Sequence, residues 1–148
     1  MTAGGTDARH LCRERALELL YEAELKEVAP SVVLESLSVV PEPFVVALVE
    51  AAARSRSRAE AAIAGAAAEW PLERMAIIDR LVMVLAIGEV LGNAPPPDAV
   101  ILDEAVELAK TYSTDASPRF VNGVLAAVLP VLHAEGAVPH DDGTPDAG

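Results

Sequence analysis

Prolines and glycines divide this chain of 148 residues into apolar segments whose hydrophobic spacing is helical. Hydrophobic residues recur every three or four positions within each segment, and no stretch alternates as a half-buried strand does. Hydrophobic residues make up 52% of the sequence and aromatic residues 3%, a balance that suits closely packed helices. The fold is therefore predicted to be all-α, a bundle of about six to seven helices with a sizeable core.

The expected helices cover residues 8–28, 31–38, 42–69, 72–91, 98–112 and 118–133. The third is expected to kink near Arg54–Arg58, and the fourth to begin with a short turn. The fourth is also the most apolar segment, which makes it the best candidate for the central helix of the core. Asp98 and Ser117 are expected to cap the N-termini of the last two helices.

Both ends of the sequence are rich in small and polar residues. Residues 1–7 and 136–148 are expected to be flexible tails, the second of them acidic. Residues 8–135 are expected to form a single domain, in halves of about 8–69 and 70–135.

The charge limits the classes of function. Eleven basic residues face 23 acidic ones, for a net charge of -12. Such a chain is a poor general polyanion binder, although a specific RNA could still bind a local basic island. The most apolar stretch is too short and too charged to span a membrane, and no signal segment opens the chain, so a soluble cytoplasmic protein is expected.

The sequence offers no motif for catalysis. Cys12 is the only cysteine, which excludes an internal disulfide and a cysteine-based zinc site, and the histidines lack metal-ligand spacing. No nucleophile, phosphate-binding or dinucleotide-binding motif occurs. No metal, no cofactor and no enzymatic activity are expected.

Basic residues gather at the start of the first helix. Arg9 and Arg13 are four residues apart and share a side, and His10 and Arg15 stand beside them. Such a cluster could bind phosphates through charge-assisted hydrogen bonds. The alternative is a solvated helix end, with neighbouring glutamates as partners of the arginines.

The start of the last helix is the second candidate region. Arg119 and the helix N-terminus both favour an anion, and Phe120 could stack on a base or pack in the core. Asn122-Gly123 is unusual, because glycine inside a helix costs about 1 kcal/mol relative to alanine. Tight packing of another helix is the expected explanation, and a closely approaching ligand is the alternative.

Four segments together resemble one known family. Residues 103–110 (DEAVELAK) and 117–125 (SPRFVNGVL) closely resemble the transcription antitermination protein NusB. Residues 13–24 resemble the arginine-led first helix of that family, and residues 70–80 resemble its W-x-L-x-R segment with the later Asp-Arg.

The resemblance implies an all-helical fold of two packed halves and a non-enzymatic role in transcription antitermination. Members bind boxA-type leader RNA of ribosomal RNA operons together with NusE, a ribosomal small-subunit protein, and thereby act indirectly on the RNA polymerase antitermination complex. The family's RNA contacts correspond here to Arg9, Arg13, Arg15, Tyr21, Arg119, Phe120 and Asn122. Its contacts to the partner protein correspond to Glu89 and Glu104.

The chain departs from the family pattern at a few positions. Val84, Gly88 and Ala116 stand where the family often has an arginine, an aromatic residue and a lysine. These changes predict weaker RNA binding, or binding that depends more on the partner protein. A helical protein-interaction module with weakened or lost RNA binding is therefore the alternative function. The sequence leaves monomer and homodimer both open.

Overall fold

The computed structural model describes residues 2–137, and side chains within residues 7–136. Its elements are α1 (Thr2–Lys26), α2 (Pro30–Ser36), α3 (Pro43–Ala66), the 3₁₀ turn η1 (Leu72–Arg74), α4 (Ile77–Val90), α5 (Asp98–Tyr112) and α6 (Ser117–Ala137). No strand occurs within these residues, so the all-α prediction is confirmed. No helix in the described part of the chain is long and apolar enough to cross a membrane.

Several helix boundaries follow from the punctuation in the sequence. Pro30 and Pro43 lie in the first turns of α2 and α3, where a missing N–H costs no hydrogen bond. At the end of α1, Glu27 adopts a positive φ of 55°, and the Val28 N–H bonds back to the Ala23 carbonyl at 3.0 Å. This left-handed cap ends the helix. The helix predicted for residues 98–112 has the observed bounds of α5.

Other boundaries differ from the prediction. α1 begins at Thr2, so residues 2–7 continue the helix, because extending a formed helix costs far less than starting one. α6 runs on to Ala137, and residues 138–148 lie outside the described part of the chain. The capping role predicted for Asp98 is wrong, since Asp98 is already helical and its carboxylate lies 2.7 Å from His133 Nε2.

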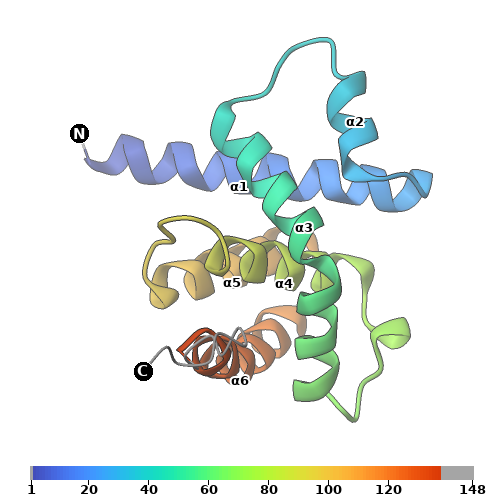
Figure 1. Ribbon diagram of the computed structural model, residues 1–148, viewed down its shortest axis with the longest axis vertical. Helices are drawn as coiled ribbons and strands as arrows, with labels where there is room; N and C mark the ends of the chain where they lie inside the picture. The colour runs from blue at the N-terminus through green and yellow to red at the C-terminus, as the bar shows by residue number, and fades with distance from the viewer. Residues whose placement is uncertain (1, 138–148) are drawn as a thin grey trace, which may run out of the picture.

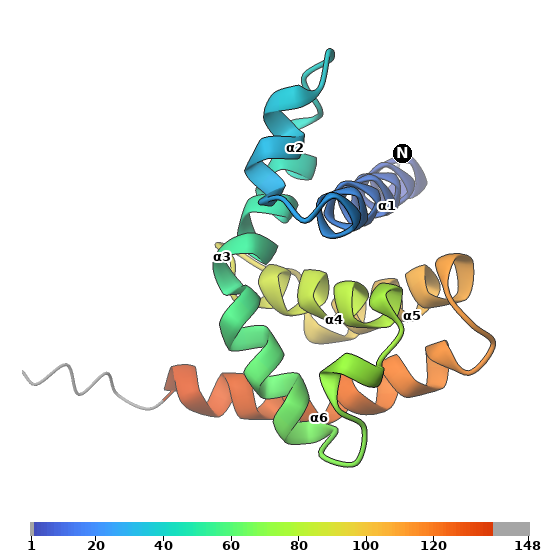
Figure 2. The same ribbon diagram turned by 90° about the vertical axis from the view of Figure 1, so that its right-hand side faces the viewer.

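The helices form three layers (Figures 1 and 2). Figure 2 shows α1 in one outer layer, α4 and α5 in the middle, and α6 in the other outer layer. α3 crosses all three layers and packs on α1, α4 and α6, while α2 covers the junction of α1 and α3. Because α4 and α5 separate them, α1 and α6 present their surfaces on different layers.

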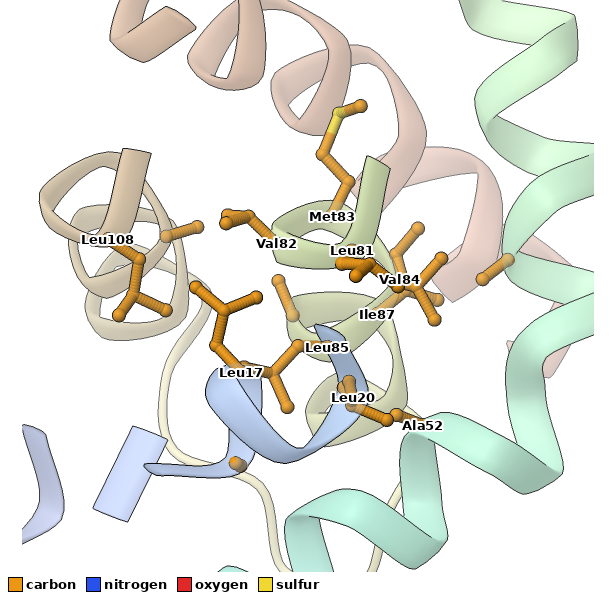
Figure 3. Packing of buried hydrophobic residues seen from close by; sticks show 14 of the residues in the cluster. Leu17, Leu20, Ala52, Leu81, Val82, Met83, Val84, Leu85, Ile87 and Leu108 are labelled. Atoms are coloured by element: carbon orange, nitrogen blue, oxygen red, sulfur yellow. The ribbon is translucent and has the colours of Figure 1, made fainter. Parts of the chain in front are cut away.

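α4 lies at the centre of the core, as predicted. It packs against α1, α3, α5 and α6, and every residue from 81 to 90 is buried. Figure 3 shows Leu17 and Leu20 of α1 reaching α4 beside Leu85, with Ala52 of α3 and Leu108 of α5 at its other sides. A helix apolar all round needs such complete cover.

Gly88 marks the closest crossing in this core. A Cβ built on Gly88 would lie 2.9 Å from both the Cα and the N of Ala52 in α3. α3 and α4 can therefore touch backbone to backbone only because residue 88 has no side chain. Val84 is also buried, so neither Gly88 nor Val84 faces a surface where RNA could bind.

Candidate nucleic-acid interface

Two arginines near the start of α1 share one aromatic ring. The guanidinium carbons of Arg9 and Arg13 lie 5.2 and 5.5 Å from the centre of the Phe44 ring at the start of α3. The distance suits a cation–π interaction in both cases. Arg9 is exposed and forms no ion pair with a described side chain, so its guanidinium edge is open to solvent. The ring orients Arg9 without consuming its hydrogen-bond donors.

Arg13 has a different environment, because it is only 3% exposed. Its Nε and Nη2 donate to the two carboxylate oxygens of Glu89 in α4 at 2.9 and 2.6 Å, and its Nη1 lies 3.8 Å from Glu104 in α5. Burial alone would lower the pKa of Arg13, but the hydrogen bonds and charge of Glu89 outweigh burial and raise it. Arg13 is thus a buried cation that joins α1 to α4 and α5.

The ion-pair network of Arg13, Glu89 and Glu104 joins residues that were predicted to contact two different partners. Arg13 was expected to contact RNA, and Glu89 and Glu104 were expected to contact a protein. In the structure these groups satisfy one another, Glu89 is only 8% exposed, and Glu104 remains partly exposed. Neither Arg13 nor Glu89 offers a free polar group to another molecule in this conformation.

His10 extends the same network toward the surface. Its Nδ1 hydrogen bonds to Glu104, and its Nε2 lies 3.3 Å from Glu14. The hydrogen bond to Glu104 raises the pKa of His10, with a further contribution from Glu14, and partial burial only reduces this rise. His10 therefore adds a proton-dependent link between α1 and α5.

The middle of α1 connects to the end of α5. Arg15 pairs with Glu18 at 3.3 Å on the exposed face, and the Tyr112 hydroxyl donates to the same glutamate at 3.1 Å. Burial, aided by Glu18, raises the pKa of Tyr112 to about 12, so its proton stays in place at neutral pH. Tyr21 is half-buried against the core. Exposed pairs such as Arg15–Glu18 are weak, and a phosphate could displace the glutamate.

The loop after Tyr112 is fastened to α4 by hydroxyl groups. Ser117 Oγ lies 2.9 Å from Ser113 Oγ, which donates to Asp79 Oδ1 at 2.6 Å. The Thr114 N–H donates to Ser117 Oγ at 3.2 Å. The predicted N-cap role of Ser117 is wrong, because Ser117 is itself the first residue of α6 and its oxygen serves this loop.

The third group of candidate residues opens α6. Arg119 and Asn122 are exposed there, and Phe120 is half-buried against the core. The predicted close packing at Gly123 is wrong, since a Cβ built there meets nothing within 4 Å. The close helix contact occurs at Gly88 instead.

Gly123 borders a groove of about 950 Å³ between the end of α3, η1 and the start of α6. Trp70, Arg74, Arg119 and Phe120 contribute to its walls. The sequence singled out Trp70 and Arg74 only as part of a family-like segment and missed them as site residues. An aromatic residue and an arginine four positions apart beside a proline were the available signal.

Ion pairing separates the basic residues into two sets. Of the eleven lysines and arginines, seven form ion pairs with described carboxylates. The set without an ion pair to a described residue comprises Arg9, Arg54, Arg74 and Arg119. Near the kink expected at Arg54–Arg58, Arg56 pairs with Glu24 of α1 and with Glu60, and Arg58 pairs with Glu135 of α6. This part of α3 therefore takes part in ion pairs with two other helices.

Comparison with known proteins agrees with the arrangement of helices. The NusB family profile matches residues 10–130. The chain is 44% identical over 126 residues to the transcription antitermination protein NusB of Acidothermus cellulolyticus, covering 82% of this chain and 86% of that protein. It is 39% identical over 125 residues to the protein of the same name from Kineococcus radiotolerans, covering 82% and 92%.

Solved structures resemble the fold over most of its length. NusB of T. maritima matches with a TM-score of 0.73 and 28% identity, covering 81% of this chain and 89% of that one. A structure of the antitermination factors NusB and NusE in complex with dsRNA matches with a TM-score of 0.70 and 22% identity, covering 83% and 96%. From the extent of the profile match and the identity to these relatives, the chain belongs to the NusB family.

Proposed function

We propose that this protein is a transcription antitermination factor that binds boxA-type leader RNA together with NusE. The observation that carries the proposal is the match to relatives named transcription antitermination protein over 82% of the chain. The similar fold found with NusE and dsRNA supports an RNA and a protein as the two partners. Within the antitermination complex, such a factor acts on RNA polymerase through its RNA and its partner.

The open arginines support a particular RNA surface. Arg9, about two turns into α1, and Arg119, at the start of α6, carry guanidinium groups that no described carboxylate neutralises. Arg15 adds a weakly paired cation on α1, and Asn122 adds an exposed amide on α6. Arginine suits this role because its fork of donors matches phosphate oxygens.

Two of the expected RNA contacts have a mainly structural environment. Arg13 is buried in the ion pair with Glu89, and Tyr21 packs against the core. We propose that they act by fixing α1, so that Arg9 and Arg15 are presented to RNA in a constant geometry.

The acidic surface of α5 supports a basic protein partner. Asp103 and Glu107 are exposed one helical turn apart, and Glu104 beside them is partly exposed. NusE docking is proposed to use this surface, with Glu104 at its edge. Glu89 then acts indirectly, by holding Arg13 under the surface.

The test is a titration of labelled boxA-type RNA with the full chain, with and without NusE. RNA affinity is expected to rise when NusE is present, and Arg9→Ala should weaken binding. Arg54→Ala is the matched control, because Arg54 is also exposed and has no ion pair to a described side chain, but it lies beside the start of α2. Absence of RNA binding even with NusE would refute the proposal and favour the protein-interaction module.

The partner surface has its own test. Glu104→Lys together with Glu107→Lys should weaken NusE binding in the absence of RNA, since both changes oppose a basic partner. Glu73→Lys, an exposed change in η1, is the control. Equal effects of both charge reversals would place the docking surface elsewhere.

A further inference from the structure

We propose that the groove bordered by η1 and α6 holds one unstacked base of the bound RNA, with Trp70 and Arg74 as additional RNA contacts. The inference rests on the proposed function and adds a defined subsite to it. The groove volume of about 950 Å³ lies in the range of about 300–1,000 Å³ that is typical of sites for small ligands. A single nucleotide is a ligand of that size class.

Two aromatic side chains give this groove faces on which a base can stack. Trp70 is 47% exposed although it is the largest hydrophobic side chain in the protein, and it lies two residues before the start of η1. Phe120 is partly buried and contributes from α6. Sequence-tolerant recognition of single-stranded RNA uses such exposed aromatic faces, and stacking contributes about 1–3 kcal/mol per base.

Two arginines bring phosphate-binding groups to the same groove. Arg74 comes from η1 and Arg119 from the first turn of α6, and both are exposed without an ion pair to any described side chain. A base held on the aromatic faces carries phosphates on either side of its sugar. Arginines from two elements of the groove can therefore bind the backbone that flanks one base.

Charge in the groove favours a nucleotide over a simple anion. Glu69 and Asp79 also contribute to the lining, so two carboxylates balance the two arginines. Asp79 is buried and accepts a hydrogen bond from Ser113 through one oxygen only. Because the charges of the groove balance, it should bind free phosphate only weakly. It suits an uncharged base inside the groove with the phosphate of the nucleotide at the rim.

Gly123 keeps the groove open. Nothing lies within 4 Å of a Cβ built at this position, and the glycine itself borders the groove. Glycine is unfavourable inside a helix, and no neighbouring helix packs closely enough here to require it. The absence of a side chain is therefore explained by the space that it leaves in the groove.

Trp70 is the only tryptophan of the chain, so its fluorescence reports on the groove directly. The probe is an unlabelled boxA-type oligoribonucleotide added to the full chain in the presence of NusE, with tryptophan emission corrected for NusE and for inner-filter effects. A base stacked on Trp70 should quench its emission, and quenching should saturate at the Kd measured in parallel by anisotropy of labelled RNA.

Variants then test the contribution of the groove to affinity. Trp70→Ala should weaken RNA binding roughly 5- to 150-fold, the range that stacking of one base implies. Gly123→Leu should weaken it by filling the groove from the exposed side of α6, and Arg74→Ala should weaken it where the control Arg54→Ala does not. Circular dichroism checks that each variant remains helical.

The outcomes distinguish the two proposals. If anisotropy shows binding but Trp70 emission is unchanged and Gly123→Leu binds with wild-type affinity, the base-binding groove is refuted while the proposed function stands; the groove would then serve another ligand. If anisotropy shows no binding with NusE present, both proposals fail.

Discussion

At the scale of single residues, the ion pair between Arg13 and Glu89 decides how α1 is held. Both side chains are almost completely buried, and the guanidinium is bound by two parallel hydrogen bonds. Removing one partner leaves the other charge buried and unpaired. Arg13→Ala is therefore expected to lower the free energy of unfolding by about 3–5 kcal/mol, measured by urea denaturation.

Arg15→Ala is the control on the same helix. Its ion pair with Glu18 is exposed, so the loss should stay below about 1 kcal/mol. Replacing both buried charges, as in Arg13→Met with Glu89→Leu, should restore most of the stability. A loss at Arg13 no larger than the loss at Arg15 would show that the buried pair contributes little.

His10 makes the same contact region sensitive to pH. Its folded pKa is raised above the ordinary 6.5, first by the hydrogen bond to Glu104. The stability contributed by the protonated ring is thus fully present below pH 6.5 and is lost as the pH rises through the higher folded pKa. Urea denaturation between pH 5.5 and 8.5 should show this decline in the wild type.

The decline should disappear in one variant and become smaller in another. His10→Gln removes the titrating group, and Glu104→Gln removes the main cause of the raised pKa but leaves the contribution of Glu14. If the stability of wild type and His10→Gln changes in parallel over this pH range, the interaction with Glu104 does not affect folding in solution.

These residues show a limit of sequence reasoning. The helical spacing correctly put Arg9 and Arg13 on one side of α1, where both lie against Phe44. Whether a guanidinium is buried in an ion pair or open to solvent depends on carboxylates that are distant in the sequence. Glu89, for example, lies 76 positions from Arg13. A spacing pattern within one helix contains no information about which side chains another helix brings to it.

At the scale of the elements, two glycines in helices have opposite roles. A side chain at Gly88 would meet the backbone of Ala52 in α3, whereas a side chain at Gly123 would meet open space. Gly88→Ala is therefore expected to destabilise the fold by about 1–3 kcal/mol through overpacking. Gly123→Ala should stabilise it by up to about 1 kcal/mol, because alanine is the better helix former.

Thermal and urea denaturation of both variants give a direct comparison. Both variants replace glycine by alanine inside a helix, and only the surroundings of the two positions differ. Each variant is therefore the control for the other. Equal changes at the two positions would mean that α3 and α4 can separate at no cost, contrary to their backbone contact at Ala52.

The helices were largely predictable from the sequence, but their closest contact was not. The prolines and the hydrophobic spacing predicted every α-helix, and the apolar composition of residues 75–91 identified the central one. The sequence favoured close packing at Gly123, but the close contact is at Gly88. A glycine in a helix indicates that a side chain is unwanted, without showing which neighbour or which open space is the reason.

At the scale of the whole molecule, the net charge of -12 makes any RNA binding depend on few cations. Most lysines and arginines already neutralise described carboxylates, and the exposed arginines without such a partner at the candidate surface are Arg9, Arg74 and Arg119. Each phosphate contact on single-stranded RNA changes the slope of log affinity against log salt by about 0.7. With Arg15, whose exposed ion pair a phosphate can displace, four such contacts predict a slope of about −3.

Substituting one arginine at a time should show how much each contributes to the slope of log affinity against log salt. Arg9→Ala should reduce its magnitude by about 0.7, and Arg54→Ala should leave it unchanged although it removes the same charge from the molecule. The comparison of the two variants distinguishes the effect of a direct phosphate contact from the effect of the net charge of the protein. Equal reductions for Arg9 and Arg54 would show that RNA responds to net charge alone, and an acidic protein would then have no defined RNA surface at α1. The measurement is RNA affinity at several salt concentrations, with NusE held at saturation, so that changes in partner binding do not enter the slope.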